Sequence, residues 1–350
     1  MIGLQSAARL EPYRECPGKK EKELPTESGT ASAMTVVVAR RGEIKTKETF
    51  MENNSKSGLD EKLTQRGVSR RAFLKYCTVV AGAMGLGPAF GPQIMEALAA
   101  DNRPPTLWLH FAECTGCTEA VLRSSAPWID ELIFDKISLD YHETLMAASG
   151  SRVEELLFET AKRYAGQFLC IVEGAIPTAN NGVYGMIGGR TMLSIAQEIC
   201  PQSLAVIALG TCASYGGLPA AAPNVTGAKG VKAALGLRLT KPVVNLPGCP
   251  PNPVNVIGTL ANYLLFGKLP PLDTLGRPLF AYGKKVHSQC PNRDHDEKCL
   301  EDFGCKGKQC YNNCPSVQFN DGTSWPVKAG HPCIGCSEPN FWDKMTPFYS

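Results

Sequence analysis

The sequence has few histidines, little net charge and few long apolar stretches. Its 350 residues include 5 histidines and carry a formal net charge of +3. Nucleic-acid-binding chains usually show a marked basic excess, so this balance gives no reason to expect such a partner. One stretch without charged side chains runs from Tyr76 to Met95, but its glycines and prolines disfavour a membrane-spanning helix.

Cysteine, in contrast, is abundant. The chain has 15 cysteines, and 7 of them lie between Cys290 and Cys336. Such a content predicts disulfides in an exported protein and metal sites in a cytosolic one. Hydrophobic residues make up 43% of the chain, which is enough for a core, and the length allows two or three domains.

The N-terminal part predicts a targeting segment rather than a folded domain. Residues 1–68 are polar and charged, without a sustained apolar period. Ser69-Arg70-Arg71-Ala72-Phe73-Leu74-Lys75 then precedes the uncharged stretch, and Ala97-Leu98-Ala99-Ala100 follows it as a small-residue cleavage site. This arrangement resembles a twin-arginine export signal, although Arg70-Arg71 could also be an ordinary basic pair.

The export signal bears on how the cysteines are used. The twin-arginine route carries proteins that have already folded and taken up cofactors, so it favours metal clusters over disulfides. The leader before the arginines is long, and Met51 begins a segment of more usual length. Residues 1–50 could therefore be a mis-called start, and we expect the mature chain to begin near Asp101.

The mature region alternates short apolar runs with helical segments. The expected strands are 106–111, 132–139, 168–172, 204–209 and 242–246, and the expected helices are 117–124, 152–165, 189–199 and 252–266. This alternation predicts an α/β fold with a doubly wound parallel sheet over residues 101–278. From Leu279 the alternation stops, so residues 279–350 should form a small irregular domain that metals hold together.

Four cysteines follow predicted strands of this sheet. Cys114 and Cys117 follow the first strand, Cys212 follows the fourth and Cys249 follows the fifth. Because the carboxyl ends of parallel strands meet at one edge, we expect these thiolates to lie close together. They would complete the ligand set of a 4Fe–4S cluster, and a structural zinc ion would take the same four ligands. The Cys114–Cys117 pair alone would also suit a redox dithiol.

The last predicted domain carries most of the other cysteines. His287 and Cys290 place an imidazole and a thiolate close together in the sequence. They are followed by Cys299, Cys305, Cys310, Cys314, Cys333 and Cys336. Composition alone does not divide these residues into sites.

Taken together, the motifs resemble those of the small, electron-transferring subunit of periplasmic nickel–iron hydrogenases. The matching stretches are Glu113-Cys114-Thr115-Gly116-Cys117-Thr118-Glu119, Glu173-Gly174-Ala175-Ile176-Pro177, Gly210-Thr211-Cys212-Ala213-Ser214, Pro247-Gly248-Cys249-Pro250-Pro251-Asn252-Pro253, Cys305-Lys306-Gly307, Tyr311-Asn312-Asn313-Cys314-Pro315 and His331-Pro332-Cys333-Ile334-Gly335-Cys336-Ser337-Glu338-Pro339. They span the expected mature chain in the family's order, and the export signal also fits this family.

The resemblance implies a flavodoxin-like domain followed by an iron–sulfur cluster-binding domain, with three clusters in all. It implies a proximal 4Fe–4S cluster on Cys114, Cys117, Cys212 and Cys249. It implies a distal 4Fe–4S cluster on His287, Cys290, Cys299 and Cys305, and a medial 3Fe–4S cluster on Cys314, Cys333 and Cys336. Pro326 stands where relatives with a fourth medial cysteine carry it, so three irons are expected there.

Some cysteines depart from the family pattern or lie outside the ligand sets. Cys310 stands where relatives have another residue, and we expect it to be a free thiol. The alternative gives Cys310 the place of Cys299 in the distal set, because the segment between Cys290 and Cys299 is shorter than in most relatives. Cys170 and Cys200 are expected to be structural.

Residues beside the first ligand also have implied roles. Glu113 and Thr115 would face the partner subunit and are candidates for a proton relay, with a plain surface or interface carboxylate as the alternative for Glu113. Gly116 and Gly217 occupy positions where oxygen-tolerant relatives carry extra cysteines. The resemblance therefore implies an ordinary four-cysteine proximal cluster and an enzyme that oxygen inhibits.

The implied function is that of the small subunit of a heterodimeric hydrogenase, which catalyses H2 ⇌ 2 H+ + 2 e−. In this family the nickel–iron centre lies in the large subunit, and electrons pass to a periplasmic c-type cytochrome or a membrane cytochrome b. No apolar run follows Cys336, so we expect a soluble periplasmic enzyme or attachment through another subunit. The alternatives are the iron–sulfur subunit of another exported respiratory oxidoreductase and a non-redox zinc protein.

Overall fold

The computed structural model describes residues 69–99, 103–124, 137–293 and 298–348. Contacts divide the chain into the units Met1–Met51 and Glu52–Ser350, and every described residue belongs to the second unit. The expected absence of a fold over residues 1–68 and the question of a mis-called start therefore lie outside the described residues.

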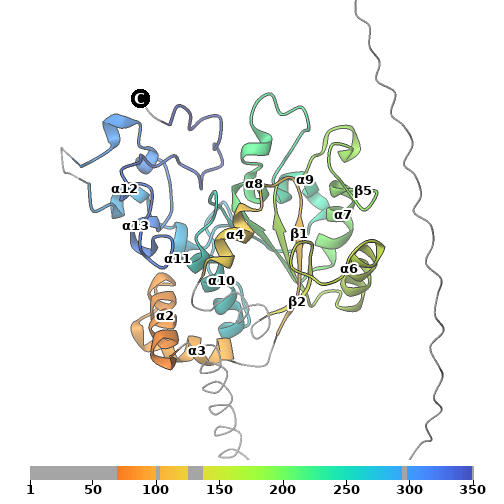
Figure 1. Ribbon diagram of the computed structural model, residues 1–350, viewed down its shortest axis with the longest axis horizontal. Coiled ribbons are helices and arrows are strands. Elements are labelled where there is room, and N and C mark those ends of the chain that lie inside the picture. The colour runs from red at the N-terminus through yellow and green to blue at the C-terminus, as the bar shows by residue number, and fades with distance from the viewer. Residues whose placement is uncertain (1–68, 100–102, 125–136, 294–297, 349–350) are drawn as a thin grey trace, which may run out of the picture. The chain divides into compact units, whose positions relative to one another are not determined.

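A sheet of five parallel strands forms the centre of the second unit, in the order β2-β1-β3-β6-β7 (Figure 1). The strands are β1 (Pro105–His110), β2 (Ser138–His142), β3 (Leu169–Glu173), β6 (Ala205–Leu209) and β7 (Val243–Leu246). The chain adds β2 on one side of β1 and the other three strands on the opposite side, which is the flavodoxin order. This order confirms the predicted α/β fold.

Four of these strands lie close to their predicted ranges, because each is mainly apolar and buried on both faces. The strand expected at 132–139 is placed too early. Strand β2 begins at Ser138, and residues 132–136 lie outside the described residues. Asp140 interrupts the apolar pattern of this edge strand, so its signal in the sequence is weak.

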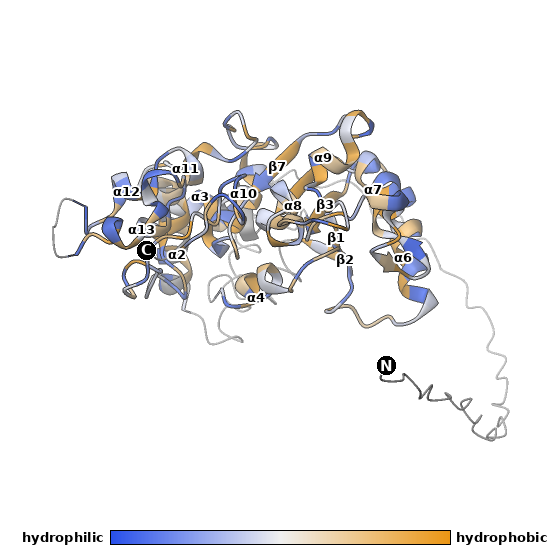
Figure 2. Cartoon of the chain, turned by 90° about the horizontal axis from the view of Figure 1, so that it is seen from above, coloured by the Kyte–Doolittle hydropathy of each residue, from blue (hydrophilic) through white to orange (hydrophobic). Residues whose placement is uncertain are grey.

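Helices cover both faces of the sheet. One face carries α6 (Ser151–Arg163), α7 (Met192–Ile199) and α9 (Val231–Leu235), and the other carries α4 (Gly116–Leu122), α10 (Pro253–Phe266) and α11 (Leu279–Tyr282). Within β1, Leu107 packs into the first core and Trp108 into the second. Figure 2 agrees with this layering, since the strands are mainly hydrophobic whereas α6 and α7 each have a hydrophilic side.

The helix expected at 189–199 begins later than predicted. A short antiparallel ribbon of β4 (Met186–Ile187) and β5 (Arg190–Thr191) precedes it, and the Thr191 side chain accepts a hydrogen bond from the Ser194 N–H as the N-cap of α7. Helix α10 instead starts as predicted: the Asn252 side chain caps it by accepting a hydrogen bond from the Val254 N–H at 2.9 Å. A short helix, α8 (Gly210–Tyr215), follows β6.

The expected export signal forms a third apolar cluster with α10. Helices α2 (Arg70–Ala83) and α3 (Gly91–Ala99), joined through the 3-10 turn η1 (Pro88–Phe90), contact α10. Phe73, Cys77 and Ile94 are buried there together with Ile257 and Ala261. Among the residues that the structure describes, no helix combines the length and apolar character needed to cross a bilayer.

The cysteine-rich region contains only short elements. They are α12 (Val286–Gln289), the 3-10 turns η7 (Glu301–Phe303) and η8 (Lys306–Lys308), and α13 (Cys314–Val317). Its apolar cluster is correspondingly small and centres on Val286, Cys310, Trp325 and Val327. So small a core agrees with a region that bound metal would stabilise. The boundary at residue 278 stays a prediction.

Candidate metal centres

The four cysteines expected at the strand ends lie together at the carboxyl edge of the sheet. Cys114 and Cys117 follow β1 at the start of α4, Cys212 lies in α8 after β6, and Cys249 follows β7. Burial, the charge of Glu173 and the other three sulfurs raise the pKa of the Cys117 thiol well above its ordinary value. Thiols that disfavour one another's ionisation in this way can share a metal, which takes the place of their protons.

The backbone leaves space between these sulfurs. Gly210 has a φ of +86°, and a Cβ atom there would lie only 2.5 Å from Cys117 Sγ. Glycine is therefore required both for the turn and for the close approach. None of the 14 cysteines that the structure describes is in a disulfide, so no ligand among them is removed in that way. The residues present fit a metal group with four thiolate ligands.

Glu173 positions the first cysteine pair, a role that the sequence motif did not indicate. It ends β3 and is 1% exposed. Its carboxylate accepts hydrogen bonds from the backbone N–H of Cys117 at 3.0 Å and of Thr118 at 3.2 Å, and from the Thr118 hydroxyl at 2.6 Å. These bonds fix the first turn of α4 and with it Cys117. The feature of the sequence that could have indicated this role is an acidic residue at the end of an otherwise apolar predicted strand.

Glu113 and Thr115, the expected relay pair, are in hydrogen-bond contact. The Thr115 hydroxyl donates to Glu113 Oε1 at 3.3 Å, and His110 Nδ1 lies 3.5 Å from the same oxygen. Burial and then the charge of Glu173 raise the pKa of Glu113, while His110 and Thr115 act in the opposite direction. His110 Nε2 lies 3.4 Å from His142 Nε2. Thr115, Glu113, His110 and His142 thus form a continuous polar row beside the first cysteine pair.

A cavity in the cysteine-rich region gathers the expected medial ligands. Its volume is about 370 Å³, and Cys314, Cys333 and Cys336 line it together with Cys249 of the first group. Burial raises the pKa of the Cys336 thiol to about 12, and the Cys310 sulfur acts in the same direction. Three thiols around one cavity fit the ligand set of the expected 3Fe–4S cluster.

The structure also places Cys310 at this cavity. Cys310 is 2% exposed, and its Sγ lies 3.0 Å from Ser337 Oγ. A hydrogen bond with Cys333, followed by burial, raises the pKa of the Cys310 thiol well above its ordinary value. These contacts place Cys310 beside medial residues, and the choice between Cys299 and Cys310 in the distal set stays a prediction.

The expected distal ligands come from short, neighbouring elements. His287 lies in α12, Cys290 follows it, and Cys305 precedes η8, which contacts α12. A Cβ atom at Gly307 would lie 3.4 Å from His287 Cβ and 3.5 Å from Cys305 Sγ, so both side chains approach the same glycine. Cys299 lies beside a segment outside the described residues, and its place in the set stays a prediction.

Hydrogen bonds join the medial ligands to both other groups. On one side, the backbone N–H of Cys333 donates to Cys305 Sγ at 3.3 Å. On the other side, the Thr211 hydroxyl donates to the backbone carbonyl of Cys336. Because Thr211 directly precedes Cys212, the three cysteine groups form one connected series.

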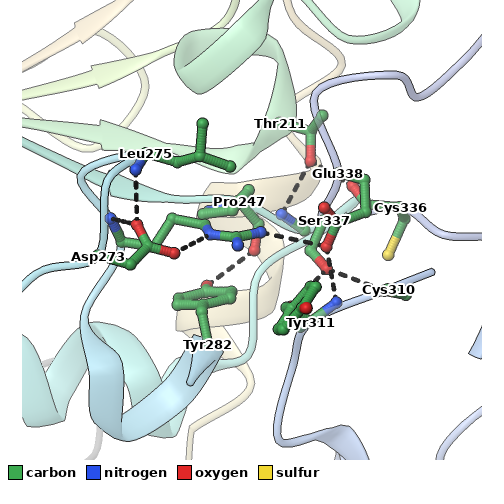
Figure 3. Close-up of polar contacts among 12 residues, drawn as sticks. Thr211, Pro247, Asp273, Leu275, Tyr282, Cys310, Tyr311, Cys336, Ser337 and Glu338 are labelled. Atoms are coloured by element: carbon green, nitrogen blue, oxygen red, sulfur yellow. Dashed lines mark hydrogen bonds and ion pairs between the residues drawn. The ribbon is translucent and has the colours of Figure 1, made fainter. Parts of the chain in front are cut away.

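A buried arginine ties the sheet to the cysteine-rich region. Arg277 is 4% exposed, and it donates through Nε to Asp273 Oδ2 at 2.8 Å and through Nη1 to Glu338 Oε1 at 3.1 Å. The same Glu338 oxygen accepts a hydrogen bond from the Tyr311 N–H at 2.6 Å (Figure 3). Each buried charge therefore has an opposite charge beside it. Since Glu338 lies two residues after Cys336, this network also holds the medial ligand loop.

Known protein families match both the sheet region and the cysteine-rich region of this chain. The family model described as NADH ubiquinone oxidoreductase, 20 Kd subunit, matches residues 114–263, and the model for the C-terminal part of the NiFe/NiFeSe hydrogenase small subunit matches residues 282–349. The periplasmic [NiFe] hydrogenase small subunit 1 of Nitratidesulfovibrio vulgaris is 52% identical over 316 residues, which cover 86% of this chain and 99% of the relative. The periplasmic [NiFe] hydrogenase small subunit of Solidesulfovibrio fructosivorans is 48% identical over 306 residues, covering 83% and 95%.

A solved structure extends the likeness to the fold. A chain of the reduced, active Ni-Fe-Se hydrogenase of Desulfomicrobium baculatum superposes with a TM-score of 0.68 at 38% identity, covering 71% of this chain and 99% of that chain. The similarity in sequence and in fold thus extends over most of this chain and nearly the whole of these relatives. The chain belongs to the family of nickel–iron hydrogenase small subunits, the electron-transfer partners of the large subunit in these heterodimeric enzymes.

Proposed function

We propose that this chain relays electrons between the nickel–iron site of a large subunit and a cytochrome-type acceptor, in the reaction H2 ⇌ 2 H+ + 2 e−. Three iron–sulfur clusters would supply its one-electron redox centres. The proposed ligands are Cys114, Cys117, Cys212 and Cys249 for a proximal 4Fe–4S cluster, Cys314, Cys333 and Cys336 for a medial 3Fe–4S cluster, and His287, Cys290, Cys299 and Cys305 for a distal 4Fe–4S cluster.

One observation carries the proposal: the three cysteine groups form a connected series rather than three isolated sites. The first group ends at exposed side chains, Cys114 and Cys249, which a large subunit could approach. The Thr211 hydroxyl links this group to the medial loop, and the Cys333 N–H links that loop to Cys305. Such a series gives electrons a bonded route from one end to the other.

The chain's own residues prepare each site for this task. Glu173 holds the first turn of α4 through its hydrogen bonds, so Cys117 faces the other three thiols. His287 offers a neutral imidazole where the other sites offer only thiolates. A cluster with one such ligand is less negative, which favours a higher potential at the last centre.

We propose a proton-relay role for Glu113 and Thr115, supported by their contact with each other and with His110. Burial raises the pKa of the Glu113 carboxyl, which favours proton uptake and release by this group. A Glu113→Gln heterodimer should show slower proton–deuterium exchange. Unchanged exchange would leave Glu113 as an interface carboxylate.

We propose export through the twin-arginine route and a periplasmic location, in line with the name of the Nitratidesulfovibrio relative. The proposed acceptor is a c-type cytochrome or a membrane cytochrome b. N-terminal sequencing of the mature protein should give a start near Asp101. Peptides from residues 1–50 in the precursor would refute the mis-called start.

A second candidate function is an iron–sulfur subunit of another respiratory oxidoreductase. The match of residues 114–263 to the 20 Kd subunit of NADH ubiquinone oxidoreductase favours it, because that match includes the whole first cysteine group. The match of residues 282–349 to the hydrogenase C-terminal region favours the hydrogenase instead. Co-purification with a nickel-containing subunit would decide between them.

The decisive experiment is isolation of the native complex, followed by nickel, iron and acid-labile sulfide analysis and a hydrogen-uptake assay. Cys114→Ser should lose iron and hydrogen uptake. Cys170→Ser is the matched control, because Cys170 is fully buried in β3 and its Sγ contacts only Cys200 Sγ, at 3.9 Å, among the described hydrogen bonds. Zinc in place of iron, or no nickel and no hydrogen uptake, would refute the proposal.

A further inference from the structure

The junction between the first and the medial cysteine group depends on one side chain, that of Thr211. It lies in the turn after β6 and is 1% exposed. Its hydroxyl accepts a hydrogen bond from the Gly248 N–H at 2.9 Å and donates its own proton to the Cys336 carbonyl. The Thr211 N–H also donates to the Gly248 carbonyl at 3.0 Å. One residue thus joins the segments that carry Cys212, Cys249 and Cys336.

Cys336 is held against the first group from a second direction. Burial raises the pKa of its thiol to about 12, and a hydrogen bond from the backbone N–H of Cys249 acts against that rise. Cys249 also lines the cavity of the medial ligands. The cavity therefore brings Cys249 of the first group beside Cys336 of the medial group.

The junction between the medial and the distal group is built differently. Its described contacts run from the Cys333 N–H to Cys305 Sγ at 3.3 Å and from the Lys306 N–H to the Cys333 carbonyl at 2.7 Å. Both contacts use backbone donors and neither involves Thr211, so a substitution of the Thr211 side chain does not remove them. Among the described contacts of the two junctions, only the junction between the first and the medial group depends on a side-chain hydroxyl. The junction between the medial and the distal group therefore serves as an internal reference in the experiment.

We propose that Thr211 is a positioning residue for electron transfer, which holds Cys336 against the segments that carry Cys212 and Cys249 and makes Cys336 the ligand through which electrons reach the medial site. This inference rests on the proposed function. In the step, the group held by the first cysteines is oxidised by one electron and the medial group is reduced by one. No bond forms or breaks, and no proton is transferred.

The test compares hydroxyl-free and hydroxyl-bearing variants of the purified heterodimer. Thr211→Val keeps the branched shape but can neither accept from Gly248 nor donate to Cys336. After rapid mixing with hydrogen and freeze-quenching, EPR should show medial reduction lagging severalfold behind the wild type. The distal group should still follow the medial group at the wild-type rate, since that junction is intact.

Two further variants isolate the hydroxyl. Thr211→Ser keeps the hydroxyl and should restore the wild-type rate. Thr259→Val is the matched control, because Thr259 is 1% exposed and its hydroxyl donates to the Asn255 carbonyl within α10 rather than to a segment that carries a proposed ligand. It should leave the rate unchanged.

Each outcome either supports or overturns the inference. A wild-type rate of medial reduction in Thr211→Val overturns the inference. A slower rate also overturns it if a redox titration shows a shifted potential of the medial group that fully explains the lag, because the substitution would then have changed the driving force of electron transfer. If Thr211→Val loses iron, the comparison is repeated with Thr211→Ala and Thr211→Ser. A lag in medial reduction in the alanine variant alone supports the inference, and equal rates in the two variants overturn it. Wild-type protein without iron and sulfide refutes the proposed function itself.

Discussion

At the scale of single residues, His142 is a built-in source of acid sensitivity. It ends β2 and is fully buried, and burial lowers its pKa from 6.5 to about 3, with His110 acting in the same direction. The folded state therefore binds fewer protons than the unfolded state below pH 6.5. Its contribution to stability is complete above that pH and is lost as the pH falls towards about 3.

We expect the melting temperature of the heterodimer to fall between pH 7 and pH 4, and to fall less steeply in His142→Gln, which has no imidazole to protonate. His331→Gln serves as the control, because His331 is exposed and should leave the profile unchanged. Parallel profiles for the wild type and His142→Gln would show that other groups govern the acid transition.

Two glycines beside the first cysteine group bear on the sensitivity of the enzyme to oxygen. A Cβ atom would lie 3.1 Å from Cys114 Sγ at Gly116, and 2.9 Å from Cys212 Sγ at Gly217. Both positions thus abut ligand sulfurs, and neither supplies an extra thiolate. We therefore predict that air stops hydrogen oxidation by the purified enzyme. Sustained turnover in an oxygen-containing hydrogen-uptake assay would contradict this expectation.

At the scale of elements, helix α2 should stay docked on α10 through Phe73. Phe73 is 1% exposed and packs in one cluster with Ile257 and Ala261. Phe73→Ala in the precursor should weaken this docking by about 3–5 kcal/mol, through lost transfer energy and the cavity left behind. Hydrogen exchange of the α2 amides should accelerate, while the sheet amides keep their protection.

Val79→Ala is the matched control for this prediction, because Val79 lies on the same helix and is 47% exposed. It should leave the exchange of α2 nearly unchanged. Equal acceleration in both variants would mean that helix propensity, rather than docking, protects α2.

The elements differ in how far the sequence determines them. Strands β3 and β6 were predictable because every residue in them is buried and all but the last residue of β3, Glu173, are apolar. Strand β2 was not, since its edge position tolerates Ser138 and Asp140. The fold of the export segment on α10 was also missed, because a mild apolar stretch with glycines gives no hint of the surface that it will cover.

At the scale of the whole molecule, Arg277 joins the sheet to the cysteine-rich region. Arg277→Met would leave Glu338 buried without its partner and should destabilise the protein by about 3–5 kcal/mol. The measurement is thermal unfolding of the heterodimer, together with its iron content. Arg152→Met is the control, since Arg152 pairs with Glu155 in solvent, and such pairs contribute little. Equal melting temperatures for Arg277→Met and Arg152→Met would show that Arg277 does not stabilise the protein in this way.

The same scale marks the limit of prediction from the sequence. The strand ends brought Cys114, Cys212 and Cys249 together because parallel topology sends them to one edge. No such rule applies after Leu279, where spacing alone left Cys310 as a free thiol or a distal ligand. Its position at the medial cavity depends on tertiary contacts such as that with Ser337, which a one-dimensional pattern does not contain.

The origin of the first cysteine group in three separate strand ends also sets an order of events during synthesis. Cys114 and Cys117 leave the ribosome well before Cys212 and Cys249, so the nascent chain carries half a site while the residues between Cys117 and Cys212 are synthesised. During that interval the first pair is an open dithiol, which an oxidising compartment would convert to a disulfide. The reducing cytoplasm keeps the unfinished pair available until the later strands supply the other two thiols.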